Sequence, residues 1–407
     1  MTLRLCAAVP VFVCLLQSNA GAQSVSLSLE EALALAREQS PAVLIARARI
    51  EEARARLIGA RVRFRDNPTF DVGGGPRDTE VGTLADLDIG FSQSFETGGQ
   101  RAARIAGAEA AIVRETAAAA EARRLALRAV ALAYLRAVYA QERIGLLRGA
   151  ETVAGDVMTI ADRRYAAGDI AALDVNMAKI GLVRARAARL ASEGERTLFA
   201  GDLERLIGMP PGSSVVAAGS LRLPRRPELA SLLAAVTNRP DLRAMEADIR
   251  DAEADVRLGH ATKRPDVGLG ARMKREEGHR AVIGVLTITL PLFNQGQELR
   301  AAGTARAARL RLELETTHVA IESEVRSLSA AYAAREAALK AFEQDAMPGV
   351  DENEALARRS FEVGQISLPE LLLVRRELVD TRLEYLNRLL EAAEAAIEQD
   401  AAAGVLQ

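Results

Sequence analysis

The segment RRYAAGDIAALDV, residues 163–175, interrupts the longest helical pattern of the chain, and it returns in altered form as RRSFEVGQISLPEL, residues 358–371. The two copies share an aromatic residue, a glycine, an isoleucine and an acidic residue in the same order: Tyr165, Gly168, Ile170 and Asp174 in the first, and Phe361, Gly364, Ile366 and Glu370 in the second. Glycine favours the left-handed conformation that ends a helix, and an acidic residue favours the first turn of the next helix. The sequence therefore predicts two long helical hairpins with matching tips.

Composition argues against an ordinary globular core. The chain has 407 residues and is 49% hydrophobic, but alanine supplies much of this, only 3% of the residues are aromatic, and tryptophan is absent. Alanine-rich helices approach closely but bury little area each, so thin layers or coiled coils suit them better than a thick core. The 53 basic and 55 acidic residues nearly balance, which gives no electrostatic reason to expect nucleic acid as a partner.

Residues 1–22 read as a secretory signal peptide. A short basic start precedes the apolar run 5–16, and Ala20-Gly21-Ala22 forms a cleavage site, so we expect the mature chain to be exported. Both cysteines, Cys6 and Cys14, lie inside this segment and leave no thiol for a disulfide, a nucleophile or a metal ligand. Lipid attachment at Cys14 is an alternative, although Val13 is larger than the residue normally found before an acylated cysteine.

The remaining pattern divides into two similar halves, which we predict to be structural repeats covering residues 23–220 and 221–407. In the first, helices broken at Ser40-Pro41 precede a β-hairpin at about 69–95 with a turn at 76–83, a helix at 100–166 and a return helix at 173–207. In the second, helices broken at Arg239-Pro240 precede a β-hairpin at about 266–290, a long helix with a break at 347–349, and a return helix at 369–400. Matching features lie close to 200 residues apart, which indicates a duplication.

The first long helix would span roughly 100 Å, far more than a globular helix. Leu127, Val130, Tyr134, Ala137, Gln141 and Ile144 keep the spacing of a coiled-coil seam, and Gly145, Gly149 and Gly155 suggest a bend near mid-length. If the strands cross a membrane, four per chain are too few for a closed barrel, since the smallest have about eight. Two copies would supply eight strands and three would supply twelve.

The sequence resembles the TolC family of outer-membrane efflux proteins over nearly all of the mature chain. The resemblance is carried by these stretches: 29–33 with Ser40-Pro41, Gln93 to Arg101, its counterpart Leu290 to Gly296, Leu206 to Gly212, and both tips. The segment from Phe95 to Arg101 is similar to the branch of the cobalt-zinc-cadmium outer-membrane component.

This resemblance implies a mainly α fold with a small β part. It implies a homotrimer with a twelve-stranded β-barrel in outer-membrane lipid and a helical barrel in the periplasm, with an equatorial region where helices break, around Gly149, 210–224 and Pro348. The implied function is the exit duct of a tripartite efflux system, with a periplasmic adaptor and an inner-membrane pump, often of the RND type. Heavy-metal cations are one class of cargo.

The tips are implied to dock the adaptor, through Tyr165, Gly168, Asp169, Ile170, Asp174, Phe361, Gly364, Gln365, Ile366 and Glu370. Glu370 also fits a position where the family places acidic residues that narrow the pore. Leu373 stands where a second acid is often found, so a gate of two acids is not expected.

No other chemistry stands out. His260, His279 and His318 belong to different elements and predict no metal site, and no nucleophile, base and acid gather in a recognisable pattern. We therefore expect neither an enzyme nor a bound cofactor. The alternative reading is a periplasmic coiled-coil adaptor or scaffold of an export system, which should instead contain a compact β domain between its hairpins.

Overall fold

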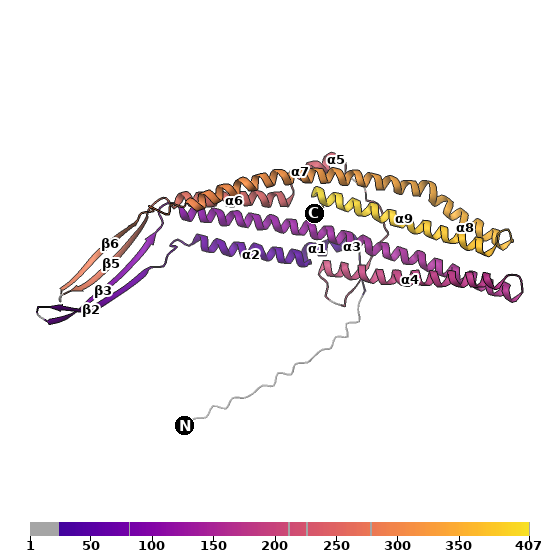
Figure 1. Cartoon of the computed structure of the whole chain (residues 1–407), viewed down its shortest axis with the longest axis horizontal. Coiled ribbons are helices and arrows are strands. Elements are labelled where there is room, and N and C mark those ends of the chain that lie inside the picture. The colour runs from indigo at the N-terminus through magenta and orange to yellow at the C-terminus, as the bar shows by residue number, and fades with distance from the viewer. Residues whose placement is uncertain (1–23, 81, 211, 225–226, 277–278, 407) are drawn as a thin grey trace, which may run out of the picture.

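The computed structural model describes residues 24–80, 82–210, 212–224, 227–276 and 279–406. These residues form an elongated layer of helices, with four strands at one end and, at the other, two turns that each connect a pair of helices (Figure 1). The expected signal peptide, residues 1–22, lies outside the described residues.

The first half of the chain follows the predicted order closely. Its elements are β1 (Ser24–Leu27), α1 (Leu29–Gln39), α2 (Pro41–Arg61), β2 (Thr69–Thr79), β3 (Gly82–Phe95), α3 (Gln100–Ala166), α4 (Ala172–Ile207) and β4 (Ser214–Ala217). Ser28 caps α1 together with Glu31, whose carboxylate accepts from the Ser28 backbone N–H at 2.7 Å. Pro41 begins α2, because its missing N–H is not needed in a first helical turn.

The second half repeats this order from α5 onward. Its elements are α5 (Leu229–Val236), α6 (Pro240–Ala261), β5 (Asp266–Glu276), β6 (His279–Thr289), α7 (Gln297–Ala341), a π-helical segment η1 (Phe342–Ala346), α8 (Met347–Glu362) and α9 (Leu368–Ala403).

One continuous helical rod runs the length of each half, and shorter helices lie end to end beside it (Figure 1). In the first half α2 and α4 pack along α3, and in the second half α6 and α9 pack along α7 and α8. The halves meet where α3 packs on α6 and α9. The Arg128–Glu398 pair, at 2.5 Å, and the Arg136–Glu394 pair, at 2.7 Å, join α3 to α9 across this contact.

The largest apolar cluster lies near the middle of the layer, where α1, α3, α4, α9 and β4 meet. The predicted seam on α3 supplies Leu127, Val130, Tyr134 and Ala137 to it, all buried. Strand β1 pairs in parallel with β4 beside this cluster, a pairing that the sequence did not predict. Because these contacts hold α3 from several sides, the helix is fixed by tertiary packing rather than by its own propensity.

The helix break expected around Gly149 is wrong, because α3 is continuous through Gly145, Gly149 and Gly155. An interior glycine costs only about 1 kcal/mol relative to alanine, and packing against α4 and α9 outweighs that cost here. The break expected at residues 347–349 is also different. The chain stays helical through this stretch, and the five-residue π-helical segment η1 lies directly before α8, whose first turn contains Pro348. Proline has no N–H to donate to the preceding turn, and the π-helical segment accommodates the carbonyl that loses this partner.

The four long strands form one antiparallel sheet in the order β2-β3-β5-β6. The strands are longer than expected: β2 and β3 pair as far as Thr79 and Gly82, so residues 76–79 are strand and not the predicted turn. Pro76 lies on an edge strand, β2, where prolines within sheets are usually found. Both edges, β2 and β6, remain open in a single copy.

Candidate channel wall and helical tips

The two tips have the same backbone structure. Gly168 and Gly364 are left-handed, with φ of 81° and 77°. In each tip the glycine N–H donates to the carbonyl three residues back, and the following N–H donates to the carbonyl five residues back. This closes each helix with the hydrogen-bond pattern that a left-handed glycine allows. The return helices begin at Ala172 and Leu368, one residue before the expected starts at 173 and 369.

Asp174 and Glu370 occupy equivalent positions, the third residue of α4 and of α9. The Asp174 carboxylate accepts from the Ala171 N–H at 3.2 Å, and the Glu370 carboxylate accepts from the Ser367 N–H at 2.7 Å and from its hydroxyl at 2.8 Å. These hydrogen bonds from Ser367 hold the pKa of Glu370 below its usual value. The local function of both acids is therefore to cap the return helix.

The two tips pack against each other around Phe361. Its ring is buried, and the guanidinium of Arg164 lies 4.6 Å from the ring centroid. Ile170 of the first tip and Ile366 of the second pack against the same apolar cluster. The chain therefore presents its two tips as one unit, and Phe361 can influence a partner only through the shape of that unit.

The other predicted tip residues divide by exposure. Those exposed to solvent are Tyr165, Gly168, Asp169, Gly364, Gln365 and Glu370, while Ile170, Asp174 and Ile366 are half-buried. Leu173 and Leu373 are 71% and 67% exposed, although they are apolar. A single copy thus leaves a mixed polar and apolar surface around both turns.

At the other end of the molecule the sheet has two chemically different faces. Directly paired residues of antiparallel strands point to the same side, so the strand register assigns every residue to a face. One face, called the apolar face below, carries large side chains on all four strands, most of them well exposed: Phe70, Val72, Leu87, Ile89, Phe91, Leu269, Met273, Val282, Leu286 and Ile288. Exposed apolar surface on this scale requires an apolar environment.

The opposite face, called the polar face below, carries charged side chains. Arg77 of β2 binds Asp86 of β3 at 2.6 Å and also pairs with Glu276 of β5. Asp88 of β3 lies 3.5 Å from Arg272 and 3.9 Å from Lys274, both of β5. Ion pairs that link three strands need water or a polar lumen beside them, since isolated charges in lipid cost several kcal/mol.

The helical wall continues this division. Gln100, at the start of α3, donates to Asp266, which points to the polar face. α6 carries an acidic stripe, Asp248, Asp251 and Asp255, and Arg306 of α7 lies 3.0 to 3.5 Å from all three. Arg114, which lies on nearly the same face of α3 as Gln100, pairs with Asp248 at 3.2 Å, so the stripe is on the same side of the wall as Gln100. Burial, followed by the charge of Asp251, raises the pKa of Asp255. Sequence reasoning missed this stripe, although its spacing of three and four residues marks one helix face.

No metal centre is visible in the described part of the chain, where no three His, Cys, Asp or Glu side chains gather closely enough to hold an ion. None of the helices that the structure describes is both long and apolar enough to cross a membrane.

The sheet has an apolar face and a polar face, and it is joined to a long layer of helices. This arrangement defines a membrane channel whose helices extend into water. The model of the family described as outer membrane efflux protein matches residues 32–209 and 232–405, and the chain belongs to that family. It is an outer-membrane efflux channel, from a family of channels rather than of enzymes.

Two curated relatives cover most of the chain. The cobalt-zinc-cadmium resistance protein CzcC of Cupriavidus metallidurans is 27% identical over 378 residues, which are 92% of this chain and 89% of the relative. The nickel-cobalt-cadmium resistance protein NccC of Alcaligenes xylosoxydans is 28% identical over 326 residues, which are 76% of this chain and 70% of the relative.

Solved structures share the fold at lower identity. The CusC channel aligns with a TM-score of 0.76 and 17% identity over 96% of this chain and 95% of its own. The open-state MtrE outer membrane channel of Neisseria gonorrhoeae aligns with a TM-score of 0.73 and 19% identity over 92% of this chain and 88% of its own. The periplasmic adaptor considered as an alternative is not supported, since the family and the fold are those of the channel.

Proposed function

We propose that three copies of the chain close a twelve-stranded barrel in the outer membrane and continue it into the periplasm as a helical tube. The observation that carries this proposal is the sheet, whose open edges β2 and β6 cannot stand in lipid. Edge β6 of one copy pairs with edge β2 of the next, so the apolar faces meet lipid and the polar faces line the lumen. The tube is passive, and the energy for transport comes from an inner-membrane pump, of the RND type by family resemblance.

The helices offer a matching contact between copies. One face of α4 carries exposed apolar side chains at helical spacing: Leu173, Met177, Ile180, Val183, Leu190 and Leu198. These residues have no cover within one copy, and we propose that a second copy covers them. The experiment is a cross-linking and fractionation assay. A trimer that resists heating should be found in outer-membrane extracts, and a soluble periplasmic monomer would contradict the proposal.

We propose that the joined tips dock the periplasmic adaptor. Gly364 is exposed and its left-handed backbone tolerates a side chain poorly, so Gly364→Glu should change both the shape and the charge of the contact. Cross-linking of the adaptor to the tips should fall at least several-fold while the trimer still assembles. Gly155→Glu is the control, since that glycine lies in α3 away from the tips with open space around it. Unchanged cross-linking in Gly364→Glu would count against docking there.

Glu370 remains our candidate for the pore constriction. One of its carboxylate oxygens accepts both hydrogen bonds from Ser367, and the carboxylate is exposed, so three copies around an axis would place three such groups near one another. Glu370→Gln keeps the capping geometry but removes the charge. It should change single-channel conductance or cation block in planar bilayers. If conductance and block are the same as in the wild type, Glu370 does not form the pore constriction.

We propose divalent heavy-metal cations as the cargo. The support is the similarity to CzcC and NccC, which are named for cobalt, zinc, nickel and cadmium resistance. Deleting the gene should lower resistance to these cations and leave resistance to hydrophobic drugs unchanged. The opposite pattern would assign the channel to a drug pump.

A further inference from the structure

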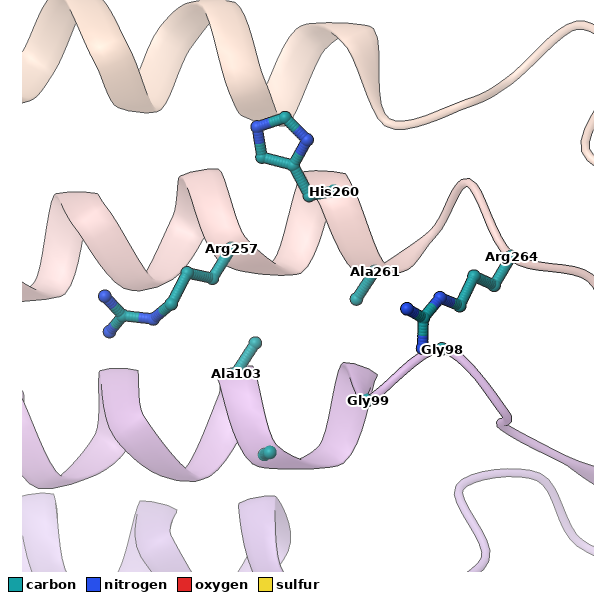
Figure 2. Close-up of a pocket in the computed structure, with 8 residues that line it drawn as sticks. Gly98, Gly99, Ala103, Arg257, His260, Ala261 and Arg264 are labelled. Atoms are coloured by element: carbon teal, nitrogen blue, oxygen red, sulfur yellow. The ribbon is translucent and has the colours of Figure 1, made fainter.

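A basic hollow lies at the junction of sheet and helices, between the start of α3 and the end of α6 (Figure 2). Its volume is about 350 Å³, and its lining consists of Gly98, Gly99, Ala102, Ala103, Arg257, His260, Ala261 and Arg264. The small residues let the two helix ends approach closely. A Cβ on Gly98 would overlap the carbonyl oxygen of Ala261, so only glycine fits there.

The positive charge in this hollow is not neutralised. Arg257 of α6 and Arg264 of the link after α6 reach toward α3, whereas His260 points to the other side of α6 (Figure 2). No acidic residue lines the hollow. In the described part of the chain neither arginine side chain has an ion pair or hydrogen bond, unlike the neighbouring Arg306 and Arg311, which pair with acids of α6. The first turn of α3 adds unpaired N–H groups, because it holds no acidic residue and no capping side chain.

The hollow opens on the apolar-face side of the wall. Residues two apart on a helix point in nearly opposite directions, since each residue turns by about 100°. Gln100 bonds Asp266 on the polar-face side, so Ala102 faces the other way. On α6, Asp255 and Arg257 are also two residues apart. Asp255 belongs to the acidic stripe on the polar-face side, so Arg257 points to the apolar-face side.

The hollow also lies at the level where a membrane would end. The strands begin just beyond it, and exposed apolar residues stand on the neighbouring links between strands and helices: Val62, Phe64, Leu292 and Phe293, the last 91% exposed. Further exposed basic residues, Arg63 and Arg65 after α2 and Lys263 after α6, flank the same level. Aromatic and basic side chains together are typical of the headgroup layer of a bilayer.

We propose that this hollow binds the phosphate of an anionic phospholipid in the leaflet on the helical side of the membrane. Arg257 and Arg264 would donate charge-assisted hydrogen bonds to the phosphate oxygens, and the N–H groups of α3 would complete the cradle. The acyl chains would then run along the apolar face of the sheet. Each copy carries one such site. The proposal rests on the proposed function in one respect, that the sheet spans a membrane.

The test is native mass spectrometry of the full-length channel, delipidated and then titrated with phosphatidylglycerol. Arg257→Gln combined with Arg264→Gln should weaken lipid binding on the order of 30-fold, given the electrostatic worth of two basic residues at an anionic surface. The matched control is Arg243→Gln with Arg250→Gln. It removes the same charge from exposed arginines on the same stripe of α6 as Arg257, about two and about four turns further from the junction.

The expected result is that the control binds phosphatidylglycerol as the wild type does. Diacylglycerol, which lacks the phosphate, should bind neither protein at the site. Equal lipid affinity of both double variants would overturn the proposal, as would equal binding of diacylglycerol by the wild type. If inorganic phosphate binds to the hollow and phosphatidylglycerol does not, the lipid assignment is wrong.

Planar-bilayer conductance and subunit mass of the same samples separate this inference from the proposed function. If the trimer conducts but its lipid affinity is unchanged in the Arg257→Gln, Arg264→Gln variant, the headgroup site is refuted and the channel function is not. A wild-type protein that neither inserts nor conducts refutes the channel.

Discussion

Substituting neighbouring residues of one strand should have opposite consequences if the sheet separates lipid from a lumen. Leu286 and Thr287 lie side by side on β6 at nearly the same depth, but Leu286 points to the apolar face with Leu269, and Thr287 points to the polar face with Gly268. An arginine on the lipid side near the bilayer midplane costs about 2 to 4 kcal/mol, whereas one in an aqueous lumen costs little. At about 1.4 kcal/mol per tenfold, Leu286→Arg should shift the assembly equilibrium of each copy by roughly 30-fold to 1000-fold.

The assay is the yield of heat-modifiable trimer in outer-membrane extracts at low, matched expression. Leu286→Arg should lose most of the trimer, and Thr287→Arg should retain it with altered ion selectivity. Equal yields for the two variants, or a larger loss for Thr287→Arg, would show that the faces have been assigned wrongly or that the sheet does not meet lipid.

Three further substitutions test the junction, the tips and the cap. Gly98→Ala forces a Cβ into backbone of α6 and should destabilise the trimer by about 1 to 3 kcal/mol, whereas Gly145→Ala, in open space within α3, should be neutral or slightly stabilising; thermal melting distinguishes them. Phe361→Ala empties the cluster shared by the tips and should expose both turns to limited proteolysis, with an unchanged cleavage pattern counting against that shared core. Because the pKa of Glu370 is lowered, its cap stabilises the fold above the ordinary value of 4.5 and is lost as pH falls through the lowered value. The protection of the Ser367 amide from hydrogen exchange, measured relative to the intrinsic exchange rate at each pH, should therefore fall on acidification in the wild type and stay constant in Glu370→Gln.

Local signals were sufficient to predict most of the helical architecture. Pro41 and Pro240 each start a helix as their missing N–H groups require, and Gly168 and Gly364 end two others in the left-handed conformation. The long helix from Gln100 to Ala166 has the predicted bounds, because no proline and no strong turn residue interrupts it.

Features that depend on distant parts of the chain could not be predicted in this way. The family resemblance implied a helix break around Gly149, but α4 and α9 pack on α3 and the helix continues through that residue. The strand pairing of β1 with β4 joins residues about 190 positions apart, and nothing local marks it. The ion pairs of the polar face could not be predicted either. The alternation of residues along one strand indicates two faces, but only the pairing of the strands shows that Arg77 lies beside Glu276.

The candidate site shows the same division. Local reasoning found the caps at Asp174 and Glu370. The family resemblance placed Phe361 among the docking residues, whereas the fold buries that ring under Arg164 between the two tips. The basic hollow needed the fold as well, because Gly98 and Arg264 are far apart in the sequence and meet only where α3 starts beside the end of α6.

The central claim is that several copies close one barrel from four strands each. Native mass spectrometry of the channel extracted from outer membranes tests it most directly, by counting subunits. The account predicts a complex of three copies, with twelve strands and no open edge. A stable monomer would contradict barrel closure altogether, and a dimer of eight strands would contradict the trimer.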